Sequence, residues 1–563
     1  MKTVNALVED ASNEKTPQNQ SEEDLKEATR IAKRWDQLET ASVNWKTHWQ
    51  ECYENIVPRK EDVVSSRMPG DRRNSDLYDT TAVLANEMLA SALHGMLTNP
   101  ETRFFELTFG DPALDEDQSV KDWCQDSGDR MFRVLNNTNF QTEIYEIYVD
   151  IGAIGTACLY MGEHDENTIH FSARAMKECR IDENNLGLID VVYRCFKWRA
   201  HQIIEEFGED KVPSFILKAN EKNSQDQFEV IHSVEPMDKE SKAESKEIGK
   251  SHAFKSTYVM KETKFLLKRD GFREFPYAVP RWSKTSGEIY GRGPGMAMLP
   301  DIMMVNAMML TVIQGAQKTV DPPLMVQDDG VIGVVRLTPG GLTIVRPGSD
   351  QIRPLITDAR IDFGQQMVED VRKRIRAGFY VDQLQLRDGP QKTAEEVRQL
   401  AEESLRLMGP VLGRQHFELL KPLITRLFGI MYRKNLLPQA PAKIQGKSFD
   451  VRYSSLIARA QRVMEAQNIS RAMGIMEPLA QLKPEVLDVL DTDQLSREVW
   501  SIFGNKHKLL LSQRDLDKKR QAQAQAMAQA KQQQDQMHQA EVVNKSAPML
   551  AAVNQGQMNG KAQ

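Results

Sequence analysis

Hydrophobic positions near the N-terminus repeat with the spacing of a helix. From Ser21 the run SEEDLKEATRIAKRWDQLETASVNWKTHW keeps this pattern without interruption, which predicts one long amphipathic helix. Ser21 and Asp24 form a variant of the capping box at its start. The preceding residues 1–20 are polar, and we expect them to be flexible.

A second helical pattern runs from about Tyr78 to Leu97 and ends near Gly95 and Asn99-Pro100. The residues expected to share its apolar face are Leu84, Met88, Ala92 and Leu93. A helix with such a face needs neighbours that bury it.

Between about Thr156 and Arg269 the pattern changes to alternation of apolar and polar residues. Five short runs, TACLYM, TIHFS, LIDVVYRCFKW, FEVIHSV and TKFLLKR, predict antiparallel strands separated by turns. One interposed run, Ala200 to Phe207, has helical spacing instead. The Lys- and Ser-rich segment Lys239 to Ser251 predicts an exposed loop.

The middle of the chain predicts a protruding hairpin. A turn rich in glycine and proline, Gly291 to Gly295, leads into a helix from about Leu299 to Lys318, which Asp321-Pro322-Pro323 ends. The short runs LMVQ, VIGVVRL and LTIV then predict two or three small strands. A second helix returns from about Asp362 to Phe379.

A long helix is predicted after this hairpin. Gly389-Pro390 marks a loop, and a capping box at Thr393 and Glu396 opens a helical pattern that continues past Leu419. Gly409 and Pro410 lie inside it and predict a kink, because proline removes a backbone donor and clashes with the preceding turn.

The C-terminal part reads as short helical segments from Pro438 to about Leu511, followed by a tail rich in Gln and Ala. The tail has helix propensity but almost no apolar face, so only parallel copies of itself could stabilise it.

Composition indicates a folded protein of several domains: 563 residues, 40% hydrophobic and 27% charged. The formal net charge of −7 gives no general positive potential that would hold nucleic acid tightly. Any contact with nucleic acid should therefore be weak and should not depend on base sequence. The five cysteines form no C-x-x-C pair, which argues against a zinc site or a disulfide framework. The N-terminus lacks the pattern of a secretory signal, so we expect the cytoplasm.

Motifs for chemistry are missing. Gly-Lys-Ser occurs at Gly249 to Ser251 and at Gly446 to Ser448, but Glu244 and Pro441 stand where a phosphate-binding loop needs glycine. Neither H-E-x-x-H nor G-x-S-x-G is present. The sequence therefore predicts a protein that is not an enzyme, with no catalytic site, no metal and no cofactor.

The most apolar stretch, Met296 to Ala316, approaches the length of a membrane span. Polar or helix-breaking residues interrupt it at Pro300, Asp301, Asn306 and Gln314. A helix packed against other protein is favoured over a membrane helix.

Five blocks of sequence form a recognisable set: RRNSDLYDTTAVLANEMLASALHGMLTNP (72–100), GEIYGRGPGMAMLPDI (287–302), QKTVDPPLMVQDDG (317–330), TAEEVRQL with the following GPVLGRQHFELLKPLI (393–424), and YSSLIARAQ (453–461). They resemble the head-to-tail connecting (portal) proteins of podovirus-type bacteriophages and occur in the order of that family. They extend over most of the folded chain.

The resemblance implies an α+β, mainly α portal fold. Its parts would be a wing of helices and antiparallel strands (21–295), a helical stem (296–321 and 359–383), a small β clip (322–358), a channel loop (384–392), a long kinked helix of wing and crown (393–437), a helical crown (438–511), and a tail that is a helical barrel or disordered (512–563).

It further implies a dodecameric ring at one capsid vertex of the virion, assembled in the host cytoplasm. Double-stranded DNA would pass through the ring during packaging and ejection without sequence specificity. The terminase motor, then tail adaptor and tail proteins, would dock on it, and capsid and scaffolding proteins would surround it. No membrane is implied.

Candidate residues follow from these roles. The channel-lining candidates are Arg372, Lys373, Arg374, Arg376, Arg387 and Lys392; the clip candidates for motor and tail are Gln327, Asp328, Asp329 and Arg336. For subunit packing in the stem the candidates are Met303, Met304, Met308 and Met309, because flexible methionines fill irregular gaps between helices. Two structural alternatives remain open. The methionines could belong to the core of a monomer, and the basic cluster could be a solvated helix face that compensates the helix dipole.

Two other function classes compete with the portal. An internal, membrane-active ejection protein would use Met296 to Ala316 and the Gln- and Ala-rich tail. A DNA-packaging enzyme would need a nucleotide loop and clustered carboxylates, which the sequence lacks.

Overall fold

The computed structural model describes residues 20–325 except 61, 66–67, 69, 74, 116, 223 and 238–251; beyond these it describes 353–354, 361–384, 408–453 except 445 and 447–449, 469–476, 478, 491, 493, 495–496, 499–500, 515–534 and 536–537. The chain forms two compact units. The larger comprises residues 1–107, 126–439 and 450–457, and the smaller comprises 108–125, 440–449 and 458–563.

The first helical pattern forms two helices and not the single long one predicted. The capping at Ser21 is confirmed: its Oγ accepts from the Asp24 N–H (3.1 Å) at the start of α2 (Glu22–Ala41). The helix breaks at Ser42, where φ is −97° and ψ is 2°, and α3 (Val43–Ile56) follows. The buried Ser42 hydroxyl donates to the Glu39 carbonyl (2.9 Å), so the side chain offers the backbone an alternative to the helix. The prediction failed because the apolar spacing continues across this break.

Helix α4 (Thr81–Leu97) lies where the sequence predicted it, but only part of the predicted face is buried. Leu93 is buried and Met88 and Ala92 are half-buried, whereas Leu84 is 56% exposed. The buried residues of the helix are Ala82, Ala85, Asn86, Leu89, Ala90, Leu93 and Leu97. Helix α7 (Phe140–Ile154) packs there so closely that a Cβ on Gly152 would lie 2.1 Å from Asn86 Oδ1. Short side chains permit this approach, which outweighs the burial that Leu84 would gain.

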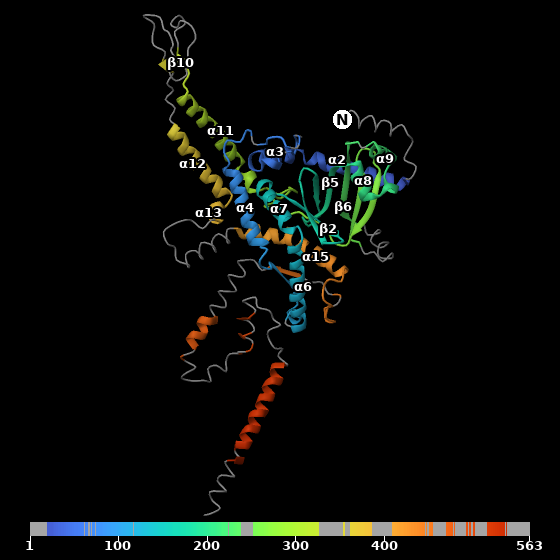
Figure 1. Ribbon diagram of the computed structural model, residues 1–563, viewed down its shortest axis with the longest axis vertical. Coiled ribbons are helices and arrows are strands. Elements are labelled where there is room, and N and C mark those ends of the chain that lie inside the picture. The colour runs from blue at the N-terminus through green and yellow to red at the C-terminus, as the bar shows by residue number, and fades with distance from the viewer. Residues whose placement is uncertain are drawn as a thin grey trace, which may run out of the picture. The chain divides into compact units, whose positions relative to one another are not determined.

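The larger unit contains a five-stranded antiparallel meander in the order β4-β5-β6-β7-β8. Its strands are β4 (Cys179–Glu183), β5 (Ile189–Arg199), β6 (Gln227–Pro236), β7 (Phe254–Met260) and β8 (Leu266–Phe272). One face packs on α8 (Ala200–Phe207) and α9 (Ser214–Glu221) through residues such as Phe196, Ile203 and Phe228. The other face packs on α2 through Ile31, Trp35 and Tyr193 (Figure 1).

Smaller sheets complete the strand set. A three-stranded sheet has the order β3-β2-β9, with β2 (Cys158–His164), β3 (Thr168–Arg174) and β9 (Tyr277–Ala278). β1 (Phe105–Thr108) pairs with β12 (Asp450–Tyr453). The antiparallel prediction for the five runs is confirmed, whereas β4 and β7 were not predicted. The predicted loop 239–251 lies outside the described residues.

The predicted helical hairpin is present as α11 (Pro294–Val320) and α12 (Ile361–Gly378), which lie side by side (Figure 1). Beyond them β10 (Leu324–Met325) pairs antiparallel with β11 (Arg353–Pro354). Residues 326–352, which hold the predicted β tip, lie outside the described residues. The short α13 (Val381–Leu384) follows α12.

The long helix after the hairpin is described from residue 408. It runs as α-helix to residue 415, as a π-helical turn over His416–Leu420, and as α15 (Lys421–Arg433). The predicted start at Thr393 lies outside the described residues. Because the description begins at residue 408, the kink at Gly409 and Pro410 remains a prediction.

The remaining elements are short or lie wholly or partly in the smaller unit. They are η1 (Pro58–Lys60), α5 (Pro112–Asp115), α6 (Gln118–Asn137) and η2 (Glu209–Lys211). Residues 515–534 of the Gln- and Ala-rich tail are helical, and no described side chain on this helix is buried. Helix propensity thus suffices for the secondary structure, and assembly of several tails remains a prediction.

Candidate functional site

Helix α11 is apolar, yet little of its second half is buried. The last buried residue is Val305, and beyond it the described side chains are half-buried or exposed. Met303 is 47% and Met304 is 39% exposed, whereas Met308 and Met309 are half-buried. Among the described residues α11 is the one helix long and apolar enough to cross a membrane by length and composition. Within the described part of the chain, the apolar surface of this half of α11 is therefore only partly covered.

The basic cluster on α12 faces acidic side chains of the same chain. Lys373 lies 3.4 Å from Asp370, Arg374 lies 3.7 Å from Asp301, and Arg376 lies 3.4 Å from Glu369. These three basic side chains are 42–66% exposed, so the ion pairs are weak and a polyanion could compete for them. Their role as channel-lining residues stays a prediction.

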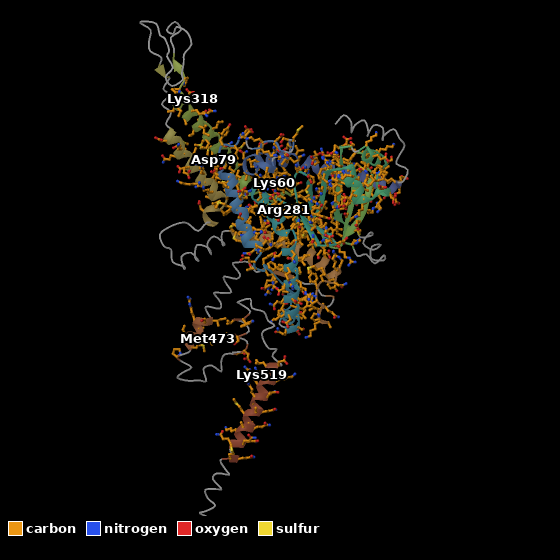
Figure 2. All side chains as sticks on the ribbon, in the orientation of Figure 1. Lys60, Asp79, Arg281, Lys318, Met473 and Lys519 are labelled. Carbon is orange, nitrogen blue, oxygen red and sulfur yellow. The ribbon has the colours of Figure 1, made fainter. Side chains whose placement is uncertain are left out.

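Arg372 differs from its neighbours because it forms part of a polar joint. It contacts the buried carboxylate of Asp79 at 2.7 Å. Asp79 lies just before α4 and is labelled in Figure 2. Burial would raise the pKa of Asp79, but the N–H and hydroxyl of Thr81 and the Arg372 guanidinium outweigh burial and hold that pKa below its usual value. The charge of Arg372 is therefore used inside the chain.

Asn306 completes this joint from α11. Its Oδ1 accepts from the N–H groups of Tyr78 (2.6 Å) and Asp79 (3.2 Å), and its Nδ2 donates to the Asp76 carbonyl (2.9 Å). In the sequence Asn306 counted only as an interruption of an apolar run. A polar residue inside such a run, on a helix expected to pack against other protein, was the signal that could have found it.

We expect Asn306→Ala to loosen the joint, because three hydrogen bonds are lost and backbone groups before α4 are left unpaired. The local cost should be about 1–3 kcal/mol. Amide hydrogen exchange at residues 76–81 should become faster by about tenfold or more. Gln314→Ala, at an exposed position of the same helix, is the matched control. Unchanged protection at 76–81 would show that Asn306 does not hold the joint.

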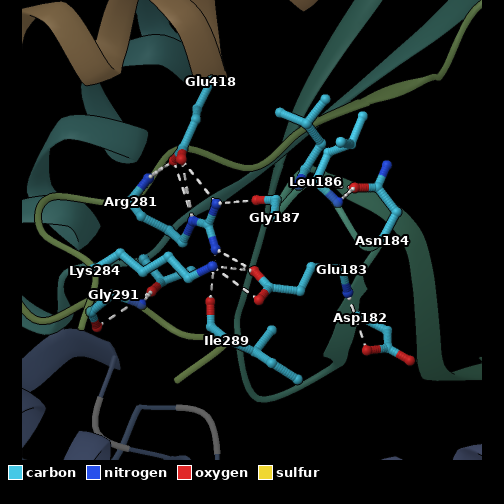
Figure 3. A network of polar contacts seen from close by, with 12 residues as sticks. Asp182, Glu183, Asn184, Leu186, Gly187, Arg281, Lys284, Ile289, Gly291 and Glu418 are labelled. Atoms are coloured by element: carbon cyan, nitrogen blue, oxygen red, sulfur yellow. Dashed lines mark hydrogen bonds and ion pairs between the residues drawn. The ribbon is translucent and has the colours of Figure 1, made fainter. Parts of the chain in front are cut away.

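A second polar network surrounds Arg281, which is buried (Figure 3). Its Nη2 donates to Glu418 Oε1 (2.8 Å) and to the Gly187 carbonyl (3.0 Å), and its Nη1 donates to Glu183 (3.0 Å) and the Ile289 carbonyl (3.0 Å). Lys284 also contacts Glu183 at 2.6 Å. The network joins the β4–β5 turn, the segment that leads into α11, and the π-helical turn.

Two more arginines fix the other end of the long helix. Arg426 is buried and lies 2.8 Å from Glu274, and Arg433 contacts Glu274 (2.6 Å) and Glu163 (2.5 Å). A Cβ on Gly429 would lie 2.2 Å from Glu274 Oε1, so glycine lets this carboxylate approach the helix. The described part of the long helix is thus anchored at its π-helical turn and along α15, and the sequence did not predict either anchor.

Several candidates cannot be placed. Gln327, Asp328, Asp329, Arg336, Arg387 and Lys392 lie outside the described residues. Within the part of the chain that the structure describes, no group of three or more His, Cys, Asp or Glu side chains is arranged to hold a metal ion. Among the described residues, polar networks fix helices, and the apolar surface of α11 beyond Val305 is half-buried or exposed.

Comparison with known proteins gives consistent relatives. The family described as bacteriophage head to tail connecting protein matches residues 28–510. The chain is 32% identical to the probable portal protein of Bordetella phage BPP-1, over 85% of this chain and 88% of that protein. It is 29% identical to the portal protein of Salmonella phage epsilon15, over 88% of this chain and 91% of that protein.

Solved structures with some likeness are chains of gene transfer agent particles. One is from the native virion, with a TM-score of 0.34, 10% identity and coverage of 75% of this chain and 94% of that chain. Another is from the neck of an empty particle, with a TM-score of 0.34, 11% identity and coverage of 75% and 95%. The family match over residues 28–510 and the relative at 32% identity are together decisive: this chain belongs to the bacteriophage head to tail connecting protein family.

Proposed function

We propose that the chain is a subunit of a portal ring at one capsid vertex, a structural part of the virion through which double-stranded DNA enters and leaves. The observation that carries this proposal is the open apolar surface of α11 in a chain of the connector family. In this proposal a second copy of the chain covers the apolar surface of α11. Head-to-tail contacts between identical copies form a ring when their rotation closes. Twelve copies are the number that the family resemblance suggests.

Electrostatics supports free passage of DNA. The net charge is −7, and the exposed basic residues of α12 lie beside carboxylates of the same chain. Such a surface offers DNA weak, salt-sensitive contacts that do not depend on sequence. In this proposal the terminase motor and later the tail proteins dock at the end of the hairpin, and the ring itself carries out no reaction.

The test is negative-stain electron microscopy of the purified full-length chain in detergent-free buffer. Rings with about twelvefold symmetry and a central hole that admits duplex DNA would support the proposal. A small closed oligomer without a hole would contradict it. If rings appeared only with detergent or lipid vesicles, the apolar surface of α11 would serve a membrane, as an ejection protein requires.

The α11 surface gives a sharper prediction. Met303→Asp with Met304→Asp should abolish ring formation while the subunit stays folded, because both positions are well exposed in the single chain but would be desolvated between copies. Size-exclusion chromatography with light scattering reports the assembly, and circular dichroism reports the fold. Asp substitutions at Gln314 and Gln317, exposed polar positions of the same helix, are the control. Rings of normal stability in the methionine variant would place the interface elsewhere.

The predicted channel loop can be tested separately. We expect Arg387→Ala with Lys392→Ala to leave rings intact and to change how much DNA the filled heads retain. Encapsidated DNA length, measured by pulsed-field electrophoresis, is the readout. Normal head filling would remove these two residues from the mechanism.

A further inference from the structure

The long helix contains a five-residue π-helical turn, His416–Leu420, between regular α-helix on both sides. A π turn holds one residue more than the α-helix it replaces, and its hydrogen bonds run from residue i to i+5. Such turns are less favourable than regular helix, so a specific contact usually compensates their cost. Here the turn carries Glu418.

Glu418 is held by donors from two directions. Its Oε2 accepts from the backbone N–H of Arg281 (2.9 Å), and its Oε1 accepts from Arg281 Nη2 (2.8 Å) and Arg414 Nη1 (3.1 Å). The side chains of Arg281 and Glu418 are 2% and 10% exposed. Gln415, just before the turn, donates to the Arg281 carbonyl (2.9 Å). Backbone and side chain of one residue are therefore both bound to the turn.

We propose that the ion pair between Arg281 and Glu418 holds residues 416–420 in the π form, and that release of Glu418 converts the turn to regular α-helix. Residues 408–415 would then move by one helical position relative to α15. One position corresponds to a rotation of about 100° and a translation of about 1.5 Å. The pair is thus a latch for a two-state helix.

The latch connects the long helix to the root of α11. Arg281 belongs to the segment that enters α11 through Gly291 and Gly293, and this segment packs tightly on Gly155. A Cβ on Gly291 would lie 2.5 Å from the Gly155 carbonyl oxygen, so the segment has little freedom to follow the helix. A change in the turn must therefore move residues 408–415. The use of this movement to join the predicted channel loop to the stem rests on the proposed function, but the latch itself does not.

Cysteine labelling can detect the movement, because it should make one position less accessible and its neighbour more accessible. In the π form Gly413 is exposed and a Cβ there has no neighbour within 4 Å, whereas Leu412 is 4% exposed. Loss of the extra residue moves each upstream residue to the place of its N-terminal neighbour, so residue 413 takes the place of Leu412. Residue 412 takes the place of the half-buried Val411.

The experiment compares maleimide labelling of Gly413→Cys and Leu412→Cys in the full-length chain, with and without Glu418→Gln. The background carries Cys195→Ser, because Cys195 is the one native cysteine that is not buried. We expect Glu418→Gln to slow labelling at 413 by at least tenfold and to accelerate it at 412. Glu274→Gln, which removes the anchor at the other end of the helix, should change neither rate.

The opposite signs separate the latch from simple stabilisation. If Glu418 only adds stability, its loss loosens the helix, and labelling at 413 stays constant or becomes faster, which overturns the proposal. If Glu418→Gln fails to fold, Glu418→Asp keeps the charge, shortens the reach, and should produce the same exchange of rates in part. Electron microscopy of the same samples keeps the two questions apart: rings with unchanged rates overturn the latch alone, and exchanged rates without rings overturn the proposed function alone.

Discussion

Arg281→Ala should lower the free energy of unfolding of the larger unit by about 3–5 kcal/mol, because the buried carboxylate of Glu418 loses its main partner. Urea unfolding followed by tryptophan fluorescence measures this change. Glu183 keeps Lys284 at 2.6 Å, so the damage should come mainly from Glu418. The expected loss is a large fraction of the stability of a typical domain.

Two controls define the cause of that loss. Arg281→Met combined with Glu418→Leu removes both charges and should cost less than Arg281→Ala alone, because no buried charge is left unpaired. Lys26→Ala removes a partner of the exposed pair with Glu22 and should change stability by less than about 0.5 kcal/mol. A double variant less stable than Arg281→Ala would mean that packing and not charge dominates at this site.

Acid should destabilise the larger unit through His232. This side chain is buried, stacks on Tyr258 with ring centroids 4.0 Å apart, and bonds Ser256 through Nε2 (3.0 Å). Burial, and then the charges of Arg194 and Arg174, lower the pKa of His232 to about 3 from 6.5. Between pH 6.5 and pH 3 the His232 imidazole therefore binds a proton in the unfolded state but stays mostly neutral in the folded state.

The sign of the pH effect follows directly. The contribution of His232 to stability is fully present above pH 6.5 and is lost as the pH falls toward 3. The loss should be about 2 kcal/mol by pH 5 and about 4 kcal/mol by pH 3. His232→Gln, which cannot be protonated in this range, should flatten the stability curve between pH 6.5 and 4 relative to the native chain. His201→Gln, at an exposed position, is the control, and a curve for His232→Gln parallel to the native one would refute the assignment.

Part of the helices and most of the strands between residues 156 and 269 could be predicted from the sequence, whereas α6, α7 and α9 were not predicted. The apolar run and the turn Gly291 to Gly295 located α11, and the alternating runs located β2, β3, β5, β6 and β8. These elements have the periodicity that burial of one face requires. β4 was missed because its run, CRIDE, has only two apolar residues, Cys179 and Ile181, among three charged ones.

The break at Ser42 and the buried face of α4 could not be predicted in the same way. Periodicity shows that apolar residues recur with helical spacing. It does not show which of two adjacent faces of the helix packs against another element. In α4 the face with Asn86 and Leu89 is buried because α7 approaches closely at Gly152, while Leu84 stays exposed. That choice depends on the partner helix, which the local sequence does not contain.

The polar joints were the least predictable part of the candidate site. Asp79 lies 227 residues before Asn306 and 293 residues before Arg372. The sequence identified Arg372 only as one of four basic residues on a helix. Its distinct position became visible once the buried carboxylate of Asp79 lay beside it.

The separation of Arg281 and Glu418 by 137 residues also sets an order of events during synthesis. At about 5–20 residues per second, a ribosome needs roughly 7–30 s to make the carboxylate after the guanidinium has emerged. Helices α11 and α12 can pair within that time, because each is long and they are joined by one connection. The segment that leads into α11 cannot form its native contacts until Glu418 of the long helix has been made. The hairpin of α11 and α12 therefore forms first, and its base is fixed to the long helix last.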